Sequence, residues 1–141
     1  MSKSIVQLQN EIIEEFADFE EWEERYQYLV ELGDELAELP EELHRDEYLV
    51  RGCQSRVWVK PELQDGNLIF LADSDTALTK GLIAILVRVF SGHPPQEIAD
   101  SSLEFIETIG LQKFLSISRR NGLNSMIELL MNYSRNIDAT N

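Results

Sequence analysis

The chain has 141 residues, the length of one domain, and its 43% hydrophobic and 27% charged residues are typical of a globular protein. Twelve Lys and Arg against 26 Asp and Glu give a formal net charge of −14. This charge argues against nucleic acids and membrane surfaces as partners, because both are bound through basic patches. A single cysteine excludes an internal disulfide, and no signal peptide or membrane-spanning segment is visible. We expect one reduced, cytoplasmic domain over residues 1–141.

The excess negative charge lies in the first third of the chain. Residues 1–50 hold 16 acidic and three basic residues, whereas residues 51–141 hold ten acidic and nine basic residues. One interpretation is an acidic face that steers the protein toward a basic partner. The other is a solvated helical surface without a partner. The sequence leaves both open.

Apolar residues recur at helical spacing at the start of the chain. Those between Ile5 and Phe16 are three and four residues apart and predict one face of an amphipathic helix. The same spacing runs from Trp22 to Leu36 and predicts a second helix. Residues 40–48 lose this periodicity, so we expect a connecting loop there.

The next segment has the pattern of strands. Residues 55–60 and 67–72 are rich in β-branched, aromatic and other apolar side chains. The turn residues Gln64-Asp65-Gly66 between them predict an antiparallel hairpin. Residues 48–50 are the candidate for a third strand.

Helical spacing returns after the hairpin. Residues 76–90 predict an apolar central helix that begins after possible N-cap oxygens at residues 73–75 and ends before Gly92. A capping-box spacing of Ser101 and Glu104 predicts a short helix, and residues 123–133 predict the last one. We therefore expect an α+β fold with helices packed on a small antiparallel sheet of about three strands.

The sequence contains no convincing metal or cofactor motif. One cysteine and two histidines, His44 and His93, lack the paired spacing of a zinc site. The acidic residues 20–24 lack the alternating ligands and the glycine of a calcium loop. The glycines do not form a phosphate-binding turn. We expect neither a bound metal nor a cofactor.

Cys53 is the remaining candidate for chemistry. It follows Gly52 between a loop and a strand, and the guanidinium groups of Arg51 and Arg56 could stabilise its thiolate. A lone cysteine is also often a small buried apolar residue. A third possibility is a nucleophilic pair of Cys53 with one of the two histidines. The residues alone do not decide between these interpretations.

The segment Gly52-Cys53-Gln54-Ser55-Arg56-Val57-Trp58 closely resembles the signature of the SufE family of sulfur-acceptor proteins. The resemblance continues in the same order along the chain and extends from about residue 22 to residue 133. Its other motifs lie at residues 28–33, 39–40, 73–75, 80–84 and 118–123. Residues 1–20 carry no family motif, so no role is assigned to them.

The resemblance implies a fold shared with IscU-type iron–sulfur scaffold proteins. It also implies that Cys53 receives sulfur as a persulfide from a SufS-like cysteine desulfurase, stimulates that enzyme and delivers the sulfur to a SufB-like scaffold complex. The protein would then be a carrier and not an enzyme, with pyridoxal phosphate bound only in the desulfurase. The family's partner surface corresponds to Arg51, Gly52, Gln54, Asp73, Asp75 and Arg119.

Two other functions remain as alternatives. A thiol hydrolase or transferase would use Cys53 with a histidine and would need no protein partner. An acidic interaction module would use Cys53 only for packing. Because Cys53 lies between apolar residues 49–50 and an apolar strand, we also expect the free protein to turn the sulfur inward, where burial would raise the thiol pKa.

Overall fold

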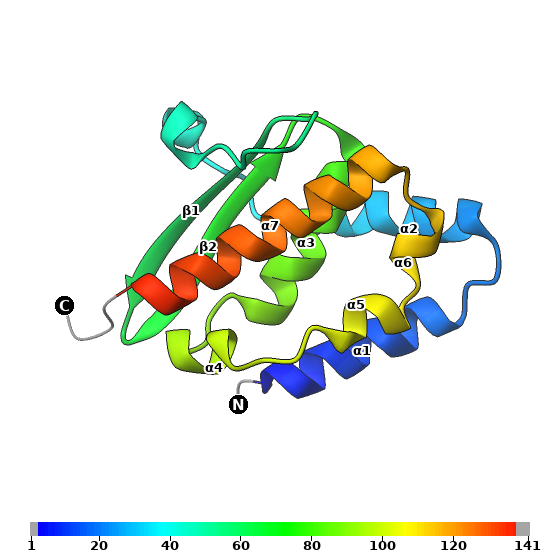
Figure 1. Ribbon diagram of the computed structural model, residues 1–141, viewed down its shortest axis with the longest axis horizontal. Coiled ribbons are helices and arrows are strands. Elements are labelled where there is room, and N and C mark those ends of the chain that lie inside the picture. The colour runs from blue at the N-terminus through cyan, green and yellow to red at the C-terminus, as the bar shows by residue number, and fades with distance from the viewer. Residues whose placement is uncertain (1–2, 138–141) are drawn as a thin grey trace.

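The computed structural model of the protein describes residues 3–137. It confirms the α+β fold, with helices packed on a small antiparallel sheet (Figure 1). The helices are α1 (Ile5–Ala17), α2 (Trp22–Glu35), α3 (Ala77–Phe90), α4 (Pro95–Ala99), α5 (Glu104–Thr108), α6 (Leu111–Phe114) and α7 (Ile117–Asn136). The strands are β1 (Val57–Gln64) and β2 (Asn67–Ser74), and the segment between α2 and β1 contains two 3₁₀ turns, Glu41–Leu43 and Asp46–Tyr48. No helix within residues 3–137 is long and apolar enough to cross a membrane.

The two strands form the predicted hairpin. They pair antiparallel from Val57 opposite Ser74 to Gln64 opposite Asn67. Asp65 and Gly66 both have positive φ, 53° and 84°, as a tight two-residue hairpin turn requires. The turn residues in the sequence therefore predicted the position of the hairpin correctly.

The expected third strand does not form within residues 3–137. Leu49 makes one isolated bridge to Trp58, and the Val50 N–H donates to the Val57 carbonyl at 2.8 Å. The chain then leaves the sheet edge at Gly52, whose φ of +91° is incompatible with an extended strand. The prediction was wrong because pairing stops after this single bridge.

Helix α3 is the centre of the structure. Ten of its fourteen residues are buried, and it packs against α1, α2, α7 and β2. The α2–α3 crossing is close because both helices have glycine there: a Cβ atom on Gly81 would lie 2.2 Å from the Leu29 carbonyl oxygen, and one on Gly33 would lie 3.0 Å from the Gly81 nitrogen. These two helices therefore meet backbone to backbone.

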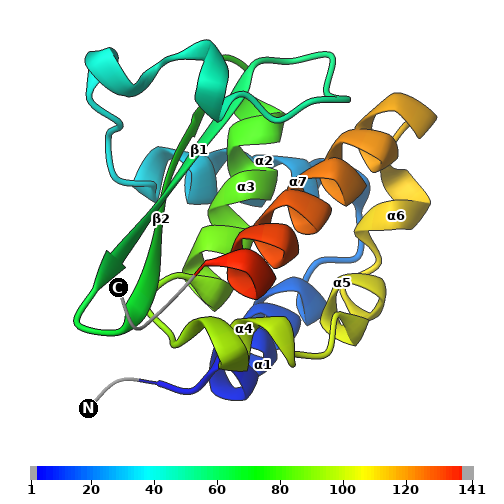
Figure 2. The ribbon, with the colours of Figure 1, turned by 60° about the vertical axis from the view of Figure 1, so that its left-hand side comes forward.

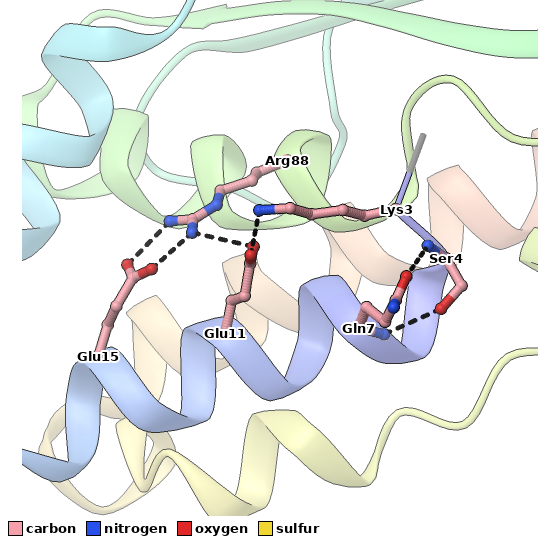
Figure 3. Close-up of polar contacts among 6 residues, drawn as sticks. All are labelled: Lys3, Ser4, Gln7, Glu11, Glu15 and Arg88. Atoms are coloured by element: carbon pink, nitrogen blue, oxygen red, sulfur yellow. Dashed lines mark hydrogen bonds and ion pairs between the residues drawn. The ribbon is translucent and has the colours of Figure 1, made fainter. Parts of the chain in front are cut away.

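The helix caps differ from the expected ones. The N-cap of α3 is Thr76, which makes no side-chain cap bond, and Asp75 instead accepts a hydrogen bond from the Arg56 N–H. The expected box of Ser101 and Glu104 is absent, since the Ser101 hydroxyl donates to the Glu97 carbonyl. A capping box forms at α1, where Ser4 and Gln7 bond reciprocally (Figure 3). These predictions were wrong because other partners compete for the same oxygens.

Part of the acidic charge of α1 is paired within the molecule. Arg88 of α3 donates from both terminal nitrogens to the Glu15 carboxylate, at 2.9 and 2.5 Å, and one of them lies 3.6 Å from Glu11 (Figure 3). Lys3 pairs with Glu11, and the Tyr28 hydroxyl bonds to Glu15. These contacts fasten α1 along α3, so the two carboxylates are not free for a partner.

The α2–α3 crossing gives a prediction for stability. Gly81→Ala would place a methyl group against a backbone carbonyl that has no room to move, and overpacking of this kind costs about 3 kcal/mol of unfolding free energy. Urea denaturation measures the loss. The control is Gly122→Ala, which changes another helical glycine. The Cβ atom added there would have the Cys53 sulfur as its nearest neighbour, at 3.3 Å. The control should stay within about 1 kcal/mol of wild type, because alanine favours the helix. Equal losses in the two variants would contradict the explanation.

Candidate functional site

Cys53 lies on a loop, residues 51–56, that passes over the first half of α7 (Figures 1 and 2). We call this segment the cysteine loop. The positive φ of Gly52 turns the chain so that the Cys53 side chain points back toward α7. Cys53 is half-buried, and its Sγ donates a long hydrogen bond of 3.5 Å to the Gly122 carbonyl. The inward orientation expected from the sequence is the one that the structure has.

Gly122 creates the space for the sulfur. A Cβ atom at this position would lie 3.3 Å from Sγ of Cys53, tighter than most Cβ contacts. Gly52 also lies close to α7, since a Cβ atom on it would lie 2.8 Å from the Ser125 hydroxyl oxygen. The loop thus rests on α7 at two positions where side chains are absent or small.

A small cavity adjoins the sulfur. Its volume is about 50 Å³, and it lies between the cysteine loop, α3 and α7. Both polar and apolar side chains line it. The lining residues are Cys53, Gln54, Ser55, Thr79, Leu82, Ser118, Arg119, Gly122 and Met126.

Hydrogen bonds fix the C-terminal base of the cysteine loop. Arg56 and Asp75 bond reciprocally: the Arg56 N–H donates to the Asp75 carboxylate at 3.0 Å, and the Asp75 N–H donates to the Arg56 carbonyl at 3.1 Å. The Ser55 hydroxyl oxygen accepts from the hydroxyls of Thr76 and Thr79, at 3.0 and 3.3 Å. The base is therefore attached to the beginning of α3, while Cys53 itself has one weak bond.

Burial sets the ionisation of the thiol. Desolvation raises the pKa of Cys53 above its usual value, because the charged thiolate is poorly solvated in this position. Arg51 and Arg56 are both exposed to solvent. In the free protein the sulfur is therefore a protonated, weakly nucleophilic thiol.

The residues expected to form the partner surface fall into two groups. Arg51, Gly52 and Gln54 are exposed around Cys53. Arg119, from α7, lines the small cavity beside the Cys53 sulfur. Asp75 is exposed but also clamps the base of the loop. These positions are close enough to share one surface.

Asp73 belongs to a different environment. Its carboxylate accepts a hydrogen bond from Nε2 of His44 at 2.7 Å and lies 3.5 Å from Nζ of Lys80. The His44 ring also packs edge-on against Trp58, with centroids 4.6 Å apart. Asp73 therefore fastens the segment between α2 and β1 to the sheet, a role that the sequence did not reveal.

Neither histidine is placed to activate the cysteine. His44 and His93 are not among the residues that line the surfaces around Cys53. His93 is buried and pairs through its backbone with Leu68, at the end of β2 remote from the cysteine loop. Within residues 3–137 no group of three His, Cys, Asp or Glu side chains could hold a metal ion.

Sequence reasoning missed the residues that hold Cys53 in place. Gly122, Ser125 and Thr79 contact the cysteine loop from α7 and α3. One signal was present: Gly122 lies inside a helix, where glycine costs about 1 kcal/mol and usually has a packing reason. Its partner could not be identified, because it lies 69 residues away in the sequence.

The contact between Gly122 and Cys53 predicts a change in thiol reactivity. Gly122→Ala should push the sulfur toward solvent, so iodoacetamide should alkylate Cys53 several-fold faster at a fixed pH. The wild-type thiol should react more slowly than free cysteine. Asn124→Ala, at an exposed position of the same helix, is the control and should react like wild type. Equal rates for all three proteins would show that Gly122 does not shield the sulfur.

The pair of His44 and Asp73 predicts a pH dependence of stability. The hydrogen bond to Asp73 raises the pKa of His44 above its usual value. The pair therefore stabilises the fold fully below pH ~6.5, the unfolded-state value, and loses this contribution as the pH rises through the folded-state pKa. His44→Asn should cost about 1 kcal/mol of unfolding free energy at pH 6 and less at pH 9. Glu47→Gln, in an exposed ion pair, should show no such difference. A cost that is the same at both pH values would contradict an ionic contribution.

Comparison with known proteins agrees with this architecture. Residues 10–134 match the family model SufE, described as an Fe–S metabolism associated domain. An uncharacterised SufE-like protein of Rhizobium meliloti (strain 1021) is 42% identical over 123 residues, which cover 84% of this chain and 88% of that protein. The solution structure of a hypothetical protein from Thermus thermophilus has the same fold, with a TM-score of 0.75 at 20% identity over 91% of this chain and 93% of that one. With a sequence match of this extent, the chain belongs to the SufE family, whose domain is associated with Fe–S metabolism.

Proposed function

We propose that this protein is a sulfur carrier that accepts a persulfide sulfur on Cys53 from a SufS-like cysteine desulfurase. The observation that supports this most is the different attachment of the two parts of the cysteine loop. Its base has four hydrogen bonds to residues 75–79, whereas Cys53 has one bond of 3.5 Å from its sulfur. Such a loop can extend its tip without losing its base.

The transfer is a displacement at sulfur. Cys53 first loses its thiol proton to solvent or to a group of the partner. The thiolate then attacks the outer sulfur of the donor persulfide, a new S–S bond forms, and the donor's S–S bond breaks. The electron pair of the broken bond leaves on the donor cysteine, which becomes a thiolate. No oxidant or reductant is consumed.

Docking must change the environment of Cys53 before this step. A buried thiol with a raised pKa is a poor nucleophile, so the free protein keeps its sulfur unreactive. A desulfurase that draws Cys53 out of its contact with Gly122 would remove the desolvation and increase the thiolate fraction. The same contact would shield a bound sulfane sulfur from stray thiols after the partner leaves.

The other family-like residues have docking roles in this proposal. Arg51, Gly52, Gln54 and Arg119 surround Cys53 and would contact the desulfurase directly. Asp75 would contribute both to docking and to the base of the loop. The carboxylate of Asp73 is already paired, so its docking role requires that the desulfurase compete with His44 and Lys80.

The carrier would pass its sulfur to a SufB-like scaffold complex for iron–sulfur cluster assembly in the cytoplasm. It would need no cofactor of its own, because pyridoxal phosphate acts in the desulfurase. It would act as a stoichiometric acceptor and activator and not as an enzyme.

The proposal predicts that Cys53→Ser folds normally but accepts no sulfur. After incubation with a cysteine desulfurase, pyridoxal phosphate and cysteine, intact mass spectrometry of wild type should show one added sulfur atom. The variant should show none and should fail to accelerate the desulfurase. Arg135→Ala, exposed near the end of α7, is a matched surface control and should behave like wild type. Undiminished stimulation by Cys53→Ser would refute the carrier function.

A further inference from the structure

Three aromatic side chains from two helices form a continuous surface beside the beginning of α7. The rings of Trp22 in α2 and Phe114 in α6 stack, with centroids 5.2 Å and planes 15° apart. Tyr26, one turn further along α2, lies edge-on to Trp22 at 6.3 Å. Tyr26 and Phe114 are 42% and 43% exposed. We call these three side chains the aromatic patch.

Arg25 helps to hold the aromatic patch in place. The Arg25 guanidinium lies 5.5 Å from the centroid of the Phe114 ring. It also donates hydrogen bonds to the carbonyls of Ile109 and Phe19, so it cannot swing away. The Phe114 ring thus contacts both an indole and a guanidinium. Rigid, exposed aromatic rings lose little entropy on binding, which is why they are frequent anchors of protein interfaces.

The aromatic patch lies close to the cysteine loop. Phe114 is three residues before Ile117, which is 70% exposed, so their Cα atoms are at most about 11 Å apart. Along α7, Ile117 is about 7.5 Å from Gly122, which contacts Cys53. Both ribbon views show the first turns of α7 between the cysteine loop and α6 (Figures 1 and 2).

These distances compare well with the size of a protein interface. A typical partner covers about 800 Å² on each side, equivalent to a disc of about 16 Å radius. A protein that docks over Cys53 with a contact of this size therefore extends along α7 to Ile117, which lies three residues after Phe114 of the aromatic patch. The same contact is too large to be filled by the cysteine loop alone.

Charges of opposite sign border the aromatic patch. Four exposed carboxylates lie just before and at the beginning of α2, and three exposed cations lie on α6 and α7. The carboxylates are Glu20, Glu21, Glu23 and Glu24, and the cations are Lys113, Arg119 and Arg120. A complementary partner needs basic groups opposite α2 and acidic groups opposite the start of α7. The net charge of −14 opposes association with a second copy of this chain.

We infer that the aromatic patch anchors the desulfurase that gives sulfur to Cys53, and that this enzyme meets the patch with apolar side chains beside a basic cluster that faces α2. This inference rests on the proposed function and adds a division of roles. Cys53 carries out the chemistry, whereas the aromatic patch supplies affinity and orientation.

The test separates affinity from chemistry. Carrier variants are titrated into a purified SufS-like desulfurase, and its rate gives the half-saturating carrier concentration and the rate at saturation. For Tyr26→Ser combined with Phe114→Ser, the half-saturating concentration should rise about tenfold or more. The saturating rate and the sulfur bound to Cys53 should stay at wild-type level. Val6→Ser is the control, because Val6 is 62% exposed on α1, and it should behave like wild type.

Two further variants keep the test decisive if Phe114→Ser unfolds. Ile117→Ser removes an exposed apolar side chain at the edge of the same surface and should raise the half-saturating concentration several-fold. Glu23→Gln combined with Glu24→Gln should weaken binding at low salt and reduce its dependence on NaCl concentration. Thermal melting monitors the folding of every variant.

Three outcomes would overturn the inference. The first is a half-saturating carrier concentration equal to that of wild type for the patch variants, while Cys53→Ser still abolishes stimulation. This result would leave the proposed function intact. The second is a patch-dependent dimer in sedimentation velocity. The third is a defect confined to sulfur delivery to a SufB-like scaffold. If wild type itself neither accepts sulfur nor stimulates the enzyme, the proposed function fails, and this inference fails with it.

Discussion

The backbone contact between α2 and α3 at Gly81 is the constraint on which the rest of the structure depends. It lets α3 approach α2 closely enough to bury its other faces against β2 and α7. The beginning of α3 is thereby fixed, and with it the hydroxyl groups of Thr76 and Thr79 that hold Ser55. The position of the cysteine loop is thus set by the packing of two helices, although α2 itself makes no hydrogen bond to the loop.

The cysteine loop combines a rigid base with a loosely held tip. At the base, Arg56 and Asp75 exchange two hydrogen bonds. At the tip, Cys53 is retained by burial and by one long bond to Gly122. Burial without strong bonding costs little to reverse, since a partner can replace the lost apolar contacts with its own. The raised pKa of the thiol follows from the same burial. Shielding of the sulfur and its low reactivity therefore have one cause, and exposure of Cys53 would end both.

Sequence patterns predicted the elements of this fold well and its long-range contacts poorly. The helices α1 and α2 and the hairpin were predictable because each shows its own periodicity or turn residues, as at Asp65-Gly66. The third strand and the caps of α3 were wrong because Gly52 bends the chain and Asp75 bonds to Arg56 instead. Cys53 was identified through its motif, whereas its contact with Gly122 joins residues 69 positions apart. No local pattern encodes such a pairing.

The structure also bears on the two interpretations of the acidic first third. The carboxylates of α1 that face α3 are paired with Arg88 and Lys3, so they serve the fold. The carboxylates of Glu23 and Glu24 at the start of α2 are exposed instead, beside rings that are themselves exposed. A purely solvated surface explains exposed carboxylates but not the adjoining fixed aromatic rings, because apolar exposure carries a cost in water. The combination of both features favours the interpretation in which part of the acidic charge guides a partner.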